Sequence, residues 1–258
     1  YYSIEISANS RAAATSHYPP ITHLLPHDIL AFGTDNSASQ LSDLTIDHLF
    51  AGFPCQDISR INDDCTGDLS ICQTGSEIIS HLRSNNPAMT VFIENVIPHS
   101  KFCPDIIDRL DTLYSIKSQC HNAIHSGAPA SRPRMYWLHP ETHMGQLPVI
   151  HHINPNLLLE DGYVSMRQPV SCILASMTTK ESARNYAVNL ATGHTREFTP
   201  DERDRFNPAQ ACGITNGYGN LPYAVETRII GSGNAFSSDE LWQVIRSYPI
   251  TPLPSRPR

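Results

Sequence analysis

The sequence has no run of apolar residues long enough to cross a membrane, and its first residues show no signal-peptide pattern. Charged residues are also scarce, at 17% of the 258 residues, and the net charge is −7. Such an acidic balance is not typical of a protein that binds nucleic acid over its whole surface. Apolar residues make up 40%, which excludes a disordered chain and leaves one large domain, or a core domain with a smaller appendage.

Cysteine pairs at metal-binding spacing are missing as well. The seven cysteines are an odd number, none forms C-x-x-C, and no Cys/His spacing is typical of a zinc site. His151 and His152 have no second pair at metal spacing, so we expect no metal. The pattern favours reduced thiols in an intracellular protein, cytoplasmic if the source is a bacterium or a virus and nuclear if it is a eukaryote.

Short apolar runs alternate with helical periodicity through the first half of the chain. This alternation predicts βαβ units, and hence an α/β fold with a mostly parallel sheet covered on both faces. We expect strands at 1–6, 23–29, 47–52, 90–94, 118–124 and 135–138, and helices at 8–18, 75–83 and 104–113.

The composition changes after about residue 139. Residues 140–217 are rich in His, Pro, Asn and Gly, which indicates an irregular second lobe. Helical segments return at 221–230 and 238–248. The sequence therefore predicts a core of 1–139 plus 218–258, interrupted by a small lobe of 140–217.

A cysteine follows the predicted strand 47–52, in the string Gly52-Phe53-Pro54-Cys55-Gln56. The carboxyl end of a parallel strand is where α/β folds bind their ligands, and Pro54 stiffens the loop. Cys55 is thus a candidate nucleophile. The alternative is a free cysteine that is packed in a loop as a small hydrophobic residue.

An acid ends the next predicted strand, in Glu94-Asn95-Val96. Partial desolvation there favours the protonated carboxyl group, which makes Glu94 a candidate proton donor. Because the ends of two parallel strands can face one crevice, Cys55 and Glu94 could share a site. The alternative for Glu94 is a helix-capping or surface acid.

Two arginines flank Pro133, directly before the predicted strand 135–138. This alternation places both guanidinium groups near one point, where they could recognise carbonyl or phosphate oxygens. The alternative for Arg132 and Arg134 is a solvated basic turn.

Four motifs occur in a fixed order along the chain: GFPCQ after a strand, ENV at the end of the next strand, R-x-R before a strand, and the late Gly233-Asn234. Together they resemble the cytosine-C5 DNA methyltransferases, most closely the de novo type, over nearly the whole chain. Three fainter matches are strings that begin at Ser3, His27 and Arg196 (SIEI, HDI and REFTPDER).

The resemblance implies a Rossmann-like, S-adenosylmethionine-dependent methyltransferase with 140–217 as its target-recognition region. In this family the cysteine, here Cys55, adds to C6 of a cytosine flipped out of duplex DNA. The acid, here Glu94, then contacts N3, and Arg132 or Arg134 would hold O2. Residues implied to bind the cofactor are Glu5 and Ile6 at the ribose, Asp28 and Ile29 at the adenine, and Pro54, Asn234 and Ala235 elsewhere in the pocket.

One family motif is missing. The Phe-x-Gly-x-Gly cofactor loop should precede Glu5, and we expect that it and the first strand lie upstream of a truncated sequence. Two alternatives stay open: a cytosine-C5 methyltransferase of structured RNA such as tRNA, and a non-catalytic regulator that keeps the fold. DNA binding by an acidic chain requires one basic cleft, for which the candidates are Lys101, Arg132, Arg134, Arg167, Lys180, Arg184 and Arg196.

Overall fold

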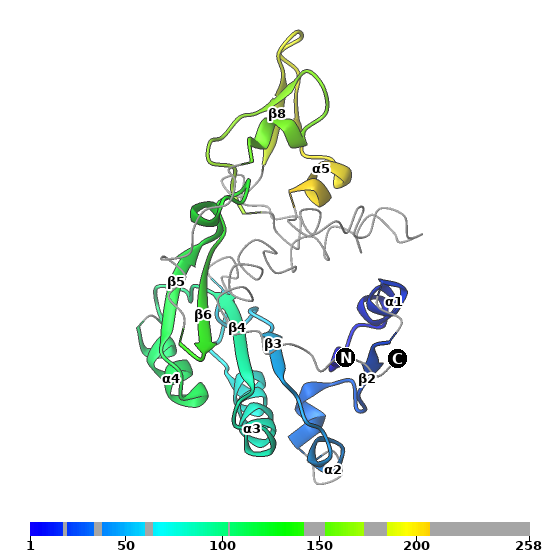
Figure 1. Cartoon of the computed structure of the whole chain (residues 1–258). Coiled ribbons are helices and arrows are strands. Elements are labelled where there is room, and N and C mark those ends of the chain that lie inside the picture. The colour runs from blue at the N-terminus through cyan, green and yellow to red at the C-terminus, as the bar shows by residue number, and fades with distance from the viewer. Residues whose placement is uncertain are drawn as a thin grey trace.

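The computed structural model describes residues 1–17, 20–33, 38–59, 64–102, 104–141, 153–172 and 185–206. Its centre is a four-stranded sheet in the order β3-β4-β6-β5 (Figure 1). The strands are β3 (His48–Gly52), β4 (Thr90–Val96), β5 (Ser118–Asn122) and β6 (Pro133–His139). β3 is parallel to β4, whereas β6 is antiparallel to both of its neighbours.

Two helices connect these strands and pack against one face of the sheet (Figure 1). α3 (Ser70–Asn85) joins β3 to β4, and α4 (Asp105–Tyr114) joins β4 to β5. α4 carries two acidic residues in its first turn, where they complement the helix dipole. The main core forms between the helices and the inward residues of β4 and β6, which are Val91, Ile93, Met135 and Trp137.

The opposite face of the sheet carries an aromatic row. The rings of Phe50 and Phe92 lie 5.9 Å apart, and those of Phe92 and Tyr136 lie 5.6 Å apart. Phe92 and Tyr136 are buried, but Phe50 on β3 is 43% exposed. β3 confirms the strand predicted at 47–52, but it is only partly buried, because it is the outermost strand of this sheet among the described residues.

The prediction of a mostly parallel sheet also needs correction at β6. Only a 3-10 helix (Ala123–Ser126) and a short loop separate β5 from β6. A parallel return needs a crossover of a dozen or more residues, so the chain turns back antiparallel instead.

The N-terminal elements form a separate two-stranded parallel sheet. β1 (Tyr2–Ser3) pairs with β2 (Thr22–His23), and α1 (Ala8–His17) confirms the predicted first helix. The strand predicted at 23–29 is wrong beyond His23, because a 3-10 helix (Ile29–Gly33) follows and leads to α2 (Ala38–Ser42).

The segment after β6 contains more regular structure than its composition indicates. β7 (Tyr163–Ser165), β8 (Tyr186–Asn189) and β9 (Thr195–Glu197) form an antiparallel sheet, preceded by a 3-10 helix (Pro155–Leu158) and followed by α5 (Pro200–Arg205). We call residues 153–172 and 185–206 the lobe. Figure 1 shows its sheet at one end of the molecule, beyond β5 and β6.

The lobe has a small core of its own, made of Leu159, Val170, Ala187, Phe198 and Phe206 together with Ala130. The helices predicted at 221–230 and 238–248 lie outside the described residues. Within the described ones, no helix has the length and hydropathy to span a membrane.

Candidate active site

Strand register brings the predicted acid and the arginines together. Gly52 at the end of β3 pairs with Glu94 on β4, and Val96, two residues further, pairs with Arg134 on β6. Because residues two apart on a strand share a face, Glu94 and Arg134 project from the same side of the sheet. The Nε atom of Arg134 lies 2.8 Å from Oε1 of Glu94, and a terminal nitrogen of Arg132 lies 3.5 Å from the same oxygen.

These three side chains are largely buried, with exposures of 12–13%. Burial lowers the pKa of the Arg134 guanidinium, but the neighbouring Cys172 and Glu94 outweigh this effect and hold the pKa above its ordinary value. Arg134 is therefore a permanent cation inside the site.

Cys55 lies in the loop after β3, where its carbonyl oxygen accepts hydrogen bonds from the amides of Ile58 (3.1 Å) and Ser59 (2.8 Å). The thiol is half-buried. Burial raises its pKa, Arg134 lowers it, Glu94 raises it, and Arg132 has a smaller lowering effect, with a net value above the ordinary one. All three charged groups thus act on this thiol, so the structure brings together the four residues predicted to be catalytic.

Two further residues contact the arginines and were missed in the sequence. Cys172 Sγ lies 3.6 Å from Arg134 and 3.8 Å from Arg132. Asn122, the last residue of β5, accepts the backbone N–H of Arg132 (2.8 Å) and donates to the hydroxyl of Ser131 (2.9 Å). No local signal could have found either, since their partners are 9 to 40 residues away in the chain.

The residues predicted to bind the cofactor ribose and adenine lie on the β1–β2 pair and just after it. Glu5 follows β1 and accepts the amide of Ser7 (2.7 Å), and Asp28 follows β2 and accepts the amide of Leu30 (3.0 Å). Ile6 is 69% exposed, whereas Ile29 packs against the main core. Because β1 and β2 are parallel, the segments that carry both carboxylates leave the same edge of this sheet.

Pro54 lies beside Cys55 in the loop after β3. Asn234 and Ala235 are outside the described residues, as are Lys180 and Arg184 of the predicted basic cleft. The described part holds no group of three metal-ligating side chains, and none of its five cysteines forms a disulfide.

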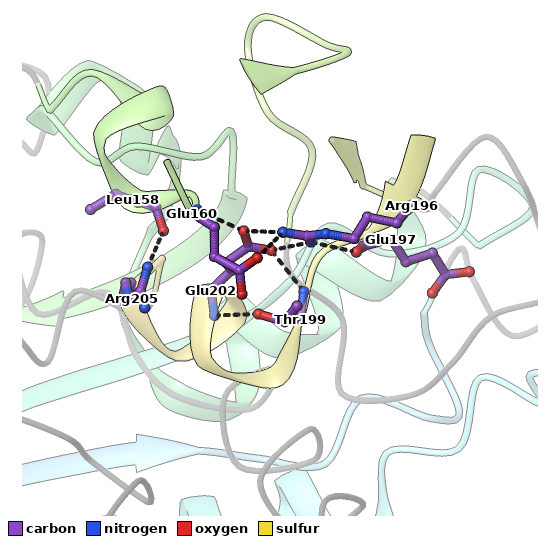
Figure 2. Close-up of polar contacts among 7 residues, drawn as sticks. All are labelled: Leu158, Glu160, Arg196, Glu197, Thr199, Glu202 and Arg205. Carbon is purple, nitrogen blue, oxygen red and sulfur yellow. Dashed lines mark hydrogen bonds and ion pairs between the residues drawn. The ribbon is translucent and has the colours of Figure 1, made fainter. Parts of the chain in front are cut away.

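Arg196 serves a different purpose from the predicted nucleic-acid contact. Its guanidinium lies 2.7 and 2.8 Å from the two carboxylate oxygens of Glu202 and 2.8 Å from Glu160, as Figure 2 shows. It also stacks on the ring of Tyr163, 4.1 Å from the centroid. The fully buried Glu202 accepts the amides of Glu160 and Thr199 as well. The charge of Arg196 is therefore used inside the lobe.

Part of the chain matches the model of a known protein family. Residues 26–143, which include Cys55, Glu94, Arg132 and Arg134, match the family model described as C-5 cytosine-specific DNA methylase. A search of curated protein sequences finds no match.

Solved methyltransferase structures share the fold. The S. pombe Dnmt2 methyltransferase has a TM-score of 0.64 at 12% identity, over 95% of this chain and 88% of that one. The E. histolytica methyltransferase EhMeth has a TM-score of 0.52 at 15% identity, over 95% of this chain and 87% of that one. A putative DNA modification methyltransferase of an E. coli prophage has a TM-score of 0.56 at 14% identity, over 95% of this chain and 92% of that one. These likenesses confirm the predicted Rossmann-like methyltransferase fold. The stretch that holds all four candidate catalytic residues, 26–143, is therefore similar to the C-5 cytosine-specific DNA methylases.

Proposed function

We propose that the protein transfers a methyl group from S-adenosylmethionine to C5 of a cytosine that is flipped out of DNA, through a covalent adduct with Cys55. One observation carries the proposal. A half-buried thiol, a carboxylate and two guanidinium groups converge at the carboxyl ends of β3 and β4 and the start of β6, inside the stretch that matches the family.

The chemistry requires a nucleophile because cytosine C5 is itself a poor one. The thiolate of Cys55 adds to C6, which forms an S–C bond and shifts the ring electrons so that C5 becomes nucleophilic. After C5 has taken the methyl group, C5 loses its proton to a base, the S–C6 bond breaks and the thiolate leaves. The target atom is inaccessible within a duplex, so the base must be flipped into the pocket.

Glu94 and the arginines match the edge of the base. Addition at C6 places negative charge on N3 and O2 of the ring. Glu94 would protonate or hydrogen-bond N3, and Arg132 or Arg134 would donate to O2, so that both groups stabilise this charge. In the free protein these side chains pair with one another, which keeps them oriented until the base enters between them.

The residues at the β1–β2 edge fit an adenosine group. Two carboxylates can accept hydrogen bonds from ribose hydroxyls and an adenine amino group, and the exposed side chain of Ile6 offers an apolar surface to the ring. S-adenosylmethionine, when bound, supplies the methyl group on a positively charged sulfur. Glu5, Ile6, Asp28 and Ile29 would hold it, together with Pro54, Asn234 and Ala235.

The proposal is tested by trapping. A 5-fluorocytosine base cannot lose a proton from C5, so the adduct persists. We expect the full chain, with S-adenosylmethionine, to form a stable covalent complex with a mixed-sequence DNA duplex that contains this base. Cys55→Ser removes the nucleophile and should abolish the complex, whereas Cys120→Ser, at an exposed thiol on β5, should retain it.

The same experiment separates the alternatives. Trapping of 5-fluorocytidine tRNA but not of DNA would replace the substrate and keep the chemistry. Trapping that survives Cys55→Ser would refute the nucleophile. A protein that binds nucleic acid but traps neither polymer would be the non-catalytic regulator, and the proposed enzyme function would be wrong.

A further inference from the structure

A glycine lies in the interior of α3, where glycine is the least favourable residue after proline. The structure supplies a reason for Gly75. A methyl group added there would lie 2.3 Å from Cζ and 2.4 Å from Cε1 of Phe53. Contacts below 3.0 Å are forbidden, so the side chain of Phe53 fills the space that the missing Cβ leaves.

The ring of Phe53 is also held by its aromatic neighbour. It stacks on Tyr114 at the end of α4, with centroids 6.0 Å apart and an interplanar angle of 13°. Tyr114 in turn meets Trp137 of β6 edge-on at 5.3 Å. Tyr114 and Trp137 are 3% and 0% exposed, so neither can yield to a displaced ring without disturbing the main core.

The backbone between Phe53 and Cys55 is stiff. Pro54 fixes one backbone torsion between Phe53 and Cys55. The carbonyl of Cys55 accepts two amides, from Ile58 and Ser59, which fix the turn that follows. A shift of the ring that the side-chain torsions of Phe53 do not absorb would therefore reach the backbone of Cys55.

We propose that Gly75 is a positioning residue that sets the place of the Cys55 thiol through the ring of Phe53. The inference rests on the proposed function, in which Cys55 must meet C6 of the base. Misplacement of a reacting group by about 1 Å can cost roughly a hundredfold in rate. A methyl group at position 75 would lie 2.3 Å from the ring, so the ring would have to move by at least 0.7 Å to reach a contact of 3.0 Å.

The test uses three variants: Gly75→Ala, Phe53→Leu and the double variant. Leucine lacks the atoms that correspond to Cζ and Cε1, so it removes the clash and keeps an apolar side chain at the same place. We expect Gly75→Ala to slow adduct formation with 5-fluorocytosine DNA by about ten- to a hundredfold at saturating DNA, with little change in the DNA concentration for half-maximal rate. The double variant should recover the rate of Phe53→Leu alone. Ser80→Ala, on the exposed side of the same helix, is the matched control and should leave the rate unchanged.

A second readout does not depend on catalysis. Alkylation of Cys55 by iodoacetamide, followed on its own peptide by mass spectrometry, should be faster in Gly75→Ala because a displaced loop exposes the thiol, and normal again in the double variant. Unchanged adduct and alkylation rates in a folded Gly75→Ala would overturn the proposal, as would a defect that Phe53→Leu fails to relieve. If the parent protein forms no adduct, the proposed function fails, while the alkylation series still decides whether Gly75 places the thiol.

Discussion

At the scale of single residues, burial and the neighbouring charges shift the pKa of the Cys55 thiol in opposite directions. Burial and Glu94 raise the pKa of its thiol, Arg134 and Arg132 lower it, and the result is above the ordinary value for cysteine. The free protein therefore holds a protonated thiol near neutral pH, although the thiolate is the reactive form. In the proposed mechanism the thiol would stay unreactive until a bound base changes its surroundings. Arg134, which lowers the pKa of the thiol, would then have a second role beside the proposed contact with O2.

The signs of these influences make a prediction for Glu94→Gln. Removal of the carboxylate charge removes a group that raises the pKa of Cys55, so the thiolate fraction near neutral pH should increase. We expect faster alkylation of Cys55 by iodoacetamide and, at the same time, a large loss of adduct formation, of about a hundredfold or more, since proton donation to N3 is lost.

The measurement is a pH profile of the alkylation rate. The midpoint should move to lower pH in Glu94→Gln and to higher pH in Arg134→Gln, which loses a cation that lowers the pKa. Glu77→Gln, at an exposed position on α3, is the control and should leave the profile in place. Shifts in the same direction for the first two variants would contradict this electrostatic account.

At the scale of elements, sequence reasoning succeeded where local pattern decides the structure. The apolar run of β4 and the periodicity of α4 predict these elements to within two residues at each end, whereas α3 begins five residues before the predicted start at 75. The antiparallel β6 was missed because strand direction depends on the length of a connection, not on the residues in the strand. Likewise, the strings around Cys55, Glu94 and Arg132 could be read from the sequence, whereas the bond from Asn122 to Arg132 exists only once β5 and β6 have paired.

Asn122 tests how far this pairing supports the site. Asn122→Ala leaves the backbone N–H of Arg132 without its partner, a loss of about 1–3 kcal/mol when such a group is buried. Arg132 should then be less well oriented, so we expect adduct formation to slow by about tenfold. Asn122→Asp keeps the acceptor oxygen and should recover part of the rate.

The control for Asn122 is Asn154→Ala. Asn154 accepts the amide of Asn156 in the lobe, so its loss removes the same kind of side-chain-to-backbone bond at a distance from the arginines. Urea unfolding measures the stability of both variants, and trapping kinetics measure the site. Equal loss of rate in the two alanine variants would mean that Asn122 supports the fold in general and not Arg132.

At the scale of the whole molecule, the described part has two hydrophobic cores, one under the main sheet and one in the lobe. Backbone bonds connect them close to the arginines: the amide of Ser131 donates to Val170 (2.8 Å), and that of Ile153 donates to Gly127 (3.3 Å). The lobe depends on the buried pair of Arg196 and Glu202 (Figure 2). Lobe and catalytic face can therefore be perturbed separately, although they meet at the same loop.

The pair of Arg196 and Glu202 predicts that the stability of the lobe depends on pH. Burial raises the pKa of Glu202, but its bonds to Arg196 and to the amides of Glu160 and Thr199 outweigh burial and hold the pKa below its ordinary value. A carboxyl with a lowered pKa stabilises the fold above the pKa of the unfolded chain, and this contribution is lost as the pH falls through the folded pKa. Glu202→Gln should therefore destabilise the lobe at neutral pH by about 3 kcal/mol, because it leaves the charge of Arg196 without its main partner.

Hydrogen exchange measures which sheet loses stability in Glu202→Gln. We expect lower protection of β8 and β9 in Glu202→Gln, unchanged protection of β4 and β6, and a smaller dependence of lobe stability on acid pH than in the parent protein. Glu160→Gln is the matched control, since its side chain is 52% exposed and its pair with Arg196 contributes within about 1 kcal/mol. If the lobe recognises the target, Glu202→Gln should weaken DNA binding while the trapped complex at saturating DNA still forms. Equal loss of protection in both sheets would show instead that the lobe and the main sheet unfold as one unit.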